Sequence, residues 1–144
     1  MAVRVPRTRE SFDAIADLWQ PPGEVEQLLA QALALPPPEP RALCHGDLHF
    51  RQLLVDGDRL SGIVDWVDLC RADPGIDLSL VYGLLSPVAR AEFLEEYGDV
   101  DPASLMRARV LALNLMAVLV HYGHDERNPD VEAEALAGLG RALV

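Results

Sequence analysis

The pattern of apolar and polar positions predicts two helices in the first quarter of the chain. Apolar residues recur there every three to four positions, which is the period of an amphipathic helix. The predicted helices run from Ser11 to about Gln20 and from about Glu24 to Leu35, with Pro21-Pro22-Gly23 as the break between them. Residues 1–8 are basic and polar, and we expect a frayed end there.

In the middle of the chain the pattern changes to short apolar runs between turn signals, which is typical of β-strands. The stretch Pro36 to Pro40 ends the second helix and leads into this region as an extended linker. Asp56-Gly57-Asp58 is a hairpin turn sequence, so the runs on either side of it predict an antiparallel ribbon. The predicted elements are a strand at Ala42–Cys44, a loop at 45–51, ribbon strands at Gln52–Val55 and Leu60–Val64, and a loop at 65–75.

The remainder of the chain has helical periodicity. Asp101 followed by Pro102 is a strong start signal, because an aspartate caps the helix and a proline fits its first turn. The most apolar run, Val110–Val120, has 11 residues. A bilayer span needs about 20, so we interpret this run as part of a buried core helix. The predicted helices are Ile76–Leu85, Val88–Tyr97, one from Asp101-Pro102 to about His121, and a last one that starts at Asn128-Pro129.

These elements predict a single domain, residues 1–144, of the mostly α (α+β) class, with helices around a small antiparallel β ribbon. The net charge of the chain indicates which classes of binding partner to expect. The chain has 12 basic residues, all arginine, and 23 acidic ones, for a net charge of −11. An acidic surface repels polyanions, so we expect no binding to nucleic acid or to anionic membranes.

The number of cysteines and the sequence of the N-terminus indicate in which cellular compartment we expect the protein. Cys44 and Cys70 are too few for a disulfide framework. Each lies in or beside an apolar run, and we expect both to be buried free thiols. The first residues lack the apolar segment of a signal peptide. Both features favour a reducing, cytoplasmic location.

Polar side chains gather at the two ends of the predicted ribbon. Asp47 and Gln52 lie at its start, and Asp65, eighteen residues after Asp47, lies at its end. An antiparallel ribbon brings its two ends together, so we expect the three side chains to converge. Two carboxylates and an amide oxygen are ligands that suit Mg²⁺.

The segment 43–78 carries three short motifs that together indicate a family. They are His45-Gly46-Asp47-Leu48-His49, Ile63-Val64-Asp65-Trp66, and Asp73-Pro74 followed by Asp77-Leu78. In order and spacing they resemble the aminoglycoside phosphotransferase family and its choline-kinase-like relatives, which share a catalytic core with protein kinases. The resemblance extends from about Ser11 to the C-terminus. It implies a kinase-like C-terminal lobe that uses ATP and Mg²⁺ to phosphorylate the hydroxyl of a small molecule.

The resemblance also assigns roles to residues. Asp47 would be the catalytic base, with His45 bracing its loop. Asp65 would hold Mg²⁺, with Gln52 where the family has asparagine as the second metal ligand. The other candidates are Asp77, His49 and Trp66 as supports of the loop, Arg51 as a partner of phosphate or of Asp47, and Asp68 and Asp73 as contacts to a cationic acceptor.

Three features depart from the family pattern. Gln52 is one methylene longer than asparagine, and Phe50-Arg51 replaces a common Pro-Gly. The family's nucleotide-binding N-terminal lobe, with its phosphate-gripping lysine, has no counterpart in the sequence. The alternative function is therefore a catalytically silent, truncated kinase-like module for binding or scaffolding. An uncovered inter-lobe face would be partly apolar, so we expect a homodimer, another partner, or the two N-terminal helices folded over the ribbon.

Two other hypotheses come from shorter signals. Gly46-Asp47-Leu48-His49 also matches the Gly-Asp-x-His of metallophosphoesterases, although a two-metal hydrolase needs more His and Asp blocks than the chain has. His121 and His124, near a predicted helix end, are either metal ligands or cations that suit the helix dipole.

Overall fold

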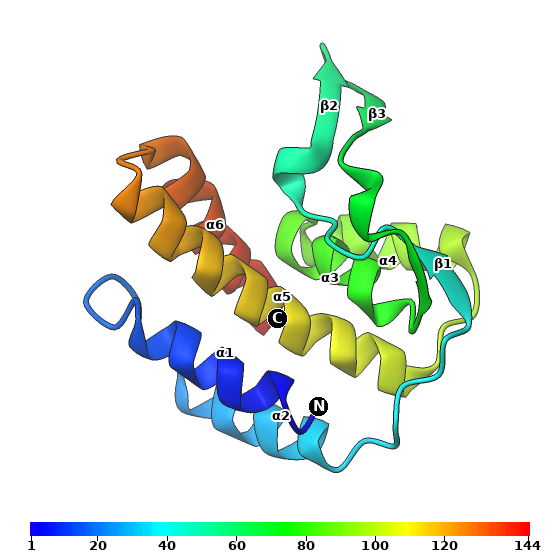
Figure 1. Ribbon diagram of the computed structural model, residues 1–144, viewed down its shortest axis with the longest axis horizontal. Coiled ribbons are helices and arrows are strands. Elements are labelled where there is room, and N and C mark those ends of the chain that lie inside the picture. The colour runs from blue at the N-terminus through cyan, green and yellow to red at the C-terminus, as the bar shows by residue number, and fades with distance from the viewer.

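The long helix α5, Pro102–Asp125, is the element against which four of the other helices pack, namely α1, α2, α3 and α6 (Figure 1). The computed structural model describes residues 1–144. Three side chains of α5, Leu113, Met116 and Val120, are fully buried where the helices meet. The remaining helices are α1 (Arg4–Asp13), α2 (Gly23–Leu33), α3 (Gly75–Leu84), α4 (Pro87–Tyr97) and α6 (Pro129–Leu143).

By length and composition alone, α5 would be able to cross a membrane. More than half of its most apolar eighteen-residue stretch is buried inside the protein, against α1, α3 and α6. This is the environment of a core helix, as predicted from the run Val110–Val120.

The first helix lies earlier in the chain than predicted. α1 spans Arg4–Asp13 rather than Ser11–Gln20, so the expectation of a frayed end at residues 1–8 is wrong. α2 and the four later helices begin and end within a few residues of the predicted bounds.

The prediction missed this helix because α1 has a buried face although most of its residues are polar. Val5, Thr8 and Phe12 follow each other at helical spacing, are all buried, and belong to a helix that packs on α5. Exposed arginines between them make the segment look polar. Pro6 falls in the first turn, where its missing N–H costs no helical hydrogen bond.

The strands form two separate antiparallel pairs. β2 (Leu53–Asp56) pairs with β3 (Arg59–Ile63), which confirms the predicted ribbon. β1 (Ala42–Cys44) pairs with β4 (Cys70–Ala72), which lies in a stretch predicted to be a loop. Three residues are too few for an alternating pattern, so β4 leaves no signal in the sequence.

The β2–β3 ribbon projects away from the helices (Figure 1). Leu54, Val55 and Leu60 are all exposed on it. The N-terminal helices instead pack on α5, so the expectation that they fold over the ribbon is wrong. Covering of the ribbon by a second copy of the chain stays a prediction.

The two cysteines differ in environment, although they are directly opposite each other in the β1–β4 pair. Cys44 is buried, as expected, and burial raises the pKa of its thiol to about 11. The expectation for Cys70 is wrong, because it is exposed together with its neighbours Leu69 and Arg71.

Candidate functional site

The loop after β1 is held by a carboxylate at the start of α3. The Asp77 carboxylate accepts the backbone N–H of His45 at 2.6 Å with one oxygen and that of Gly46 at 3.1 Å with the other. Gly46 has φ +96°, and a Cβ at this position would overlap the backbone carbonyl oxygen of Asp68. The loop is therefore fixed between α3 and the one-turn 3-10 helix at Trp66–Asp68.

His45 joins this loop to the end of the ribbon. Its imidazole is buried and packs on Trp66, with the two ring centroids 4.7 Å apart. Nε2 lies 2.9 Å from the carbonyl oxygen of Val64, and Nδ1 lies 3.4 Å from the backbone nitrogen of Asp47. A neutral ring with its proton on Nε2 satisfies both contacts, because a carbonyl only accepts and an N–H only donates.

Asp47 and Asp65 are free carboxylates near the two ends of the ribbon. Both are exposed, and neither has a hydrogen bond or an ion pair from its side chain. Asp65 directly follows Val64, the residue that His45 contacts, and has a left-handed backbone with φ 67° and ψ 54°. His45 thus links the backbone of Asp47 to Val64, the residue before Asp65. These two contacts hold the two ends of the ribbon close together.

His49 lies within the electrostatic influence of both carboxylates. Its imidazole is buried, and this burial lowers the pKa of His49 from its ordinary value. The charges of Asp47 and Asp65 oppose the shift, whereas that of Arg51 adds to it. His49 therefore favours the neutral form, in which Nδ1 accepts the N–H of Arg51 at 3.3 Å.

Gln52 closes the loop rather than extending toward solvent. It is buried, and its Oε1 accepts the backbone N–H of His49 at 3.1 Å. Its backbone carbonyl accepts the N–H of Val64 at 3.0 Å. An amide oxygen has a second lone pair, so a metal ligand role at Gln52 would share this oxygen with the loop.

Arg51 points to α5 and not to the carboxylates. Its guanidinium lies 4.4 Å from the centroid of the Tyr122 ring and donates to the Tyr122 hydroxyl at 3.2 Å. The expected pairing with Asp47 is therefore absent. Asp68 is exposed, and its backbone carbonyl is the group that approaches Gly46.

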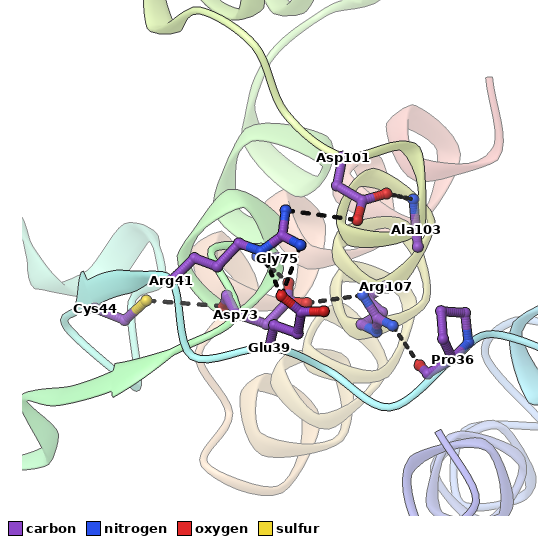
Figure 2. A network of polar contacts seen from close by, with 9 residues as sticks. All are labelled: Pro36, Glu39, Arg41, Cys44, Asp73, Gly75, Asp101, Ala103 and Arg107. Carbon is purple, nitrogen blue, oxygen red and sulfur yellow. Dashed lines mark hydrogen bonds and ion pairs between the residues drawn. The ribbon is translucent and has the colours of Figure 1, made fainter.

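Asp73 is part of a buried ion pair, which corrects its assignment to the mouth of the site. Its Oδ2 lies 2.7 Å from Arg107 Nη1, and the two side chains are 5% and 6% exposed. Its Oδ1 accepts the N–H of Gly75 at the start of α3. Figure 2 shows Arg107 between Asp73 and the carbonyl of Pro36, to which it also donates. Because its charge is already neutralised, Asp73 is not available to a cationic acceptor.

A small cavity of about 90 Å³ lies beside Asp47. Four polar residues line it, of which only Asp47 was expected at the site. The other three are Arg4 of α1, Ser79 of α3 and Asn114 of α5. The one signal for them in the sequence is Asn114, a polar residue inside the most apolar run of the chain.

No group of three or more His, Cys, Asp or Glu side chains in the protein is arranged to hold a metal ion. His121 instead pairs with Asp125 at 3.4 Å and His124 with Glu132 at 3.3 Å, both on the surface. A metal at the loop would consequently need oxygens from a bound ligand in addition to Asp65.

A family model described as "Phosphotransferase enzyme family" matches residues 2–110. The chain is also similar to the uncharacterized protein YcbJ of Bacillus subtilis (strain 168), at 37% identity over 57 residues. That match covers 39% of this chain and 19% of YcbJ, so it spans about a fifth of the relative's length.

Proposed function

Since the chain belongs to the phosphotransferase enzyme family, we propose that it transfers the γ-phosphoryl group of Mg²⁺-ATP to a hydroxyl of a small molecule. The observation that carries this proposal is the pair of free carboxylates, Asp47 and Asp65, whose loops are held together by His45. Unpaired acidic groups on loops that the rest of the fold fixes rigidly are typical of catalytic sites.

Asp47 is the proposed general base. It lines the small cavity, where the hydroxyl of an acceptor fits beside its carboxylate. The hydroxyl proton moves to Asp47 as the oxygen forms its bond to phosphorus, and the bond from phosphorus to the leaving oxygen of ADP breaks. Asp77 acts indirectly, because its two hydrogen bonds fix the backbone that carries Asp47.

Asp65 is the proposed ligand of Mg²⁺. Its exposed carboxylate is a hard oxygen donor with no partner in the protein, which fits this ion. The second lone pair of Gln52 Oε1 is the other oxygen available from the loop. When bound, Mg²⁺ would neutralise charge on the phosphates.

A second candidate function is a binding module that keeps this fold without the reaction. Two contacts favour it. Gln52 already uses its oxygen to close the loop, and Arg51 is stacked on Tyr122 instead of facing a phosphate. In this reading Asp47 and Asp65 would be free because nothing uses them.

An assay of phosphoryl transfer separates the two functions. ADP release would be measured with Mg²⁺-ATP and a panel of small hydroxyl compounds. We expect acceptor-dependent release, and we expect Asp47→Asn to lower it by about 10²- to 10⁴-fold, the usual contribution of a general base. Asp99→Asn, an exposed aspartate without side-chain partners, is the matched control. Release that is equal in both variants, or the same with and without acceptor, would favour the binding module.

A further inference from the structure

A larger cavity of about 380 Å³ adjoins the one beside Asp47. The two cavities share Arg4, Ile76 and Leu111 in their walls. A volume of this size is in the range of pockets that hold small molecules, which begins at about 300 Å³. A ligand in the larger cavity therefore extends along the wall that leads to Asp47.

Positive charge dominates the wall of this larger cavity. Three arginines line it: Arg4, Arg71 and Arg107. Asp73 is its one acidic residue, and it is paired with Arg107. The positive charge that is left on the wall after this pairing comes from Arg4 and Arg71, which are exposed and have no ion pair. In a chain of net charge −11, two unpaired arginines on one cavity wall form a local reversal of the overall charge.

Arg107 is the third arginine of this wall. It is buried, and it donates to Asp73 and to the carbonyl of Pro36 (Figure 2). Its Nε is the one buried side-chain nitrogen or oxygen in the protein without a hydrogen-bond partner. Buried polar groups are nearly always paired, so the Arg107 guanidinium is unusual in keeping one N–H, at Nε, without a partner in the protein.

We propose that the acceptor is a small hydroxyl compound with an anionic group, a carboxylate or a phosphate, which binds against Arg4 and Arg71. This inference rests on the proposed function and names the substrate class of the same site. The anionic group lies in the larger cavity and the hydroxyl reaches the small cavity beside Asp47. The proposal replaces the expected cationic acceptor, because Asp73 is neutralised by Arg107 and Asp68 lines neither of the two cavities.

Arginine suits this task, because its planar guanidinium donates two parallel hydrogen bonds to a carboxylate or phosphate. The two arginines come from distant parts of the chain, Arg4 from α1 and Arg71 from β4. Their meeting at one cavity also gives the N-terminal helix a function: it carries a ligand contact to the site.

Calorimetric titration without nucleotide tests this binding separately from phosphoryl transfer. The probes are glycerate and glycerol 3-phosphate, with neutral glycerol and cationic choline as comparisons. We expect both anions to bind and the other two compounds to give no saturable heat. Arg4→Gln and Arg71→Gln are each expected to weaken glycerate binding by about tenfold, the loss of one charge-assisted contact. Arg7→Gln, on the same helix and exposed but outside the cavity, is the matched control.

The outcomes distinguish this proposal from the proposed function. Binding of glycerate without any binding of Mg²⁺-ATP would uphold the anion site and overturn phosphoryl transfer. Glycerol or choline binding as tightly as glycerate, or Arg7→Gln weakening binding as much as Arg71→Gln, would overturn the anion site. Failure of both anions to bind a protein that does bind Mg²⁺-ATP would also overturn it, and would leave phosphoryl transfer standing.

Discussion

The Asp77 carboxylate lies 2.6 Å from the backbone nitrogen of His45, thirty-two residues earlier in the chain. This contact ties the start of α3 to the loop that carries Asp47. A second hydrogen bond, from the N–H of Gly46, leaves the carboxylate bridging two successive backbone donors. The position of Asp47 is therefore set by a residue that does not itself take part in the proposed reaction.

Replacing this bridge should destabilise the protein. Asp77→Asn keeps the size of the side chain but turns one acceptor into a donor that faces a backbone N–H. We expect a loss of about 1–3 kcal/mol in the free energy of unfolding, the cost of unmaking hydrogen bonds to a charged group. Urea denaturation measures this quantity, and Asp99→Asn should change it by less than about 0.5 kcal/mol. Equal stability of the two variants would show that the bridge contributes little.

The Asp73–Arg107 pair should be far more important for stability than a similar pair on the surface. Arg107→Met leaves Asp73 buried without its partner, and we expect a loss of about 3–5 kcal/mol in the free energy of unfolding. Arg9 and Glu26 are also paired, at 2.8 Å, but both are exposed. Because solvent screens that pair, Arg9→Met should have little effect. Similar denaturation midpoints for the two variants would contradict the structural role of Arg107.

Gly46 and Gly57 both have positive φ, yet alanine should be tolerated at only one of them. At Gly57 a Cβ meets no atom within 4 Å, so Gly57→Ala adds only backbone strain of about 1–2 kcal/mol. At Gly46 the Cβ overlaps the Asp68 carbonyl, so the loop has to move. We expect Gly46→Ala to lower the free energy of unfolding by more than about 3 kcal/mol, as strain and steric overlap add. Thermal unfolding of both variants tests this, and a smaller effect at Gly46 would argue against the tight loop.

The two thiols should react at very different rates. Cys70 is exposed, whereas Cys44 is buried and the pKa of its thiol is raised to about 11. At pH 8 we expect Ellman's reagent to modify one thiol quickly and the second only after unfolding in urea. Cys70→Ser should abolish the fast phase and Cys44→Ser should leave it. Fast modification of Cys44 would contradict its burial.

The free energy of unfolding should fall at high pH because the thiol of Cys44 is buried. Burial raises the pKa of Cys44 from 9.0 to about 11, so the unfolded chain loses the thiol proton at a lower pH than the folded protein. The stabilising effect of the neutral thiol is complete below about pH 9 and is lost as the pH rises toward about 11. Cys44→Ala should remove this part of the decline, which thermal melts between pH 8 and 11 would detect.

Local signals explain why part of the site is predictable from sequence. Asp47 and Asp65 border short apolar runs, and Asp77 follows a Pro-Gly start signal, so neighbouring residues alone place them on loops and at a helix start. The β2–β3 ribbon, which lies between Asp47 and Asp65 in the chain, was also predictable, because the local turn sequence Asp56-Gly57-Asp58 indicates a hairpin.

The features that were not predicted depend on contacts between distant residues. Arg107 meets Asp73 across 34 positions and Pro36 across 71, and no local pattern encodes either contact. Arg4 reaches the cavity because the face with Val5 packs on α5. The short strand β4 exists because β1 supplies its hydrogen bonds. The arginine-lined cavity is formed by contacts of this kind.

Calorimetric titration of ATP, with and without Mg²⁺, into the wild-type protein and Asp65→Asn tests whether the carboxylate of Asp65 holds the metal that phosphoryl transfer needs. We expect saturable binding that requires Mg²⁺ and is lost in Asp65→Asn, because this exposed carboxylate is the proposed metal ligand. Asp58→Asn, an exposed aspartate in the ribbon turn, should bind as the wild type does. Equal binding by Asp65→Asn, or no binding by the wild type at millimolar Mg²⁺-ATP, would contradict the proposed phosphoryl transfer.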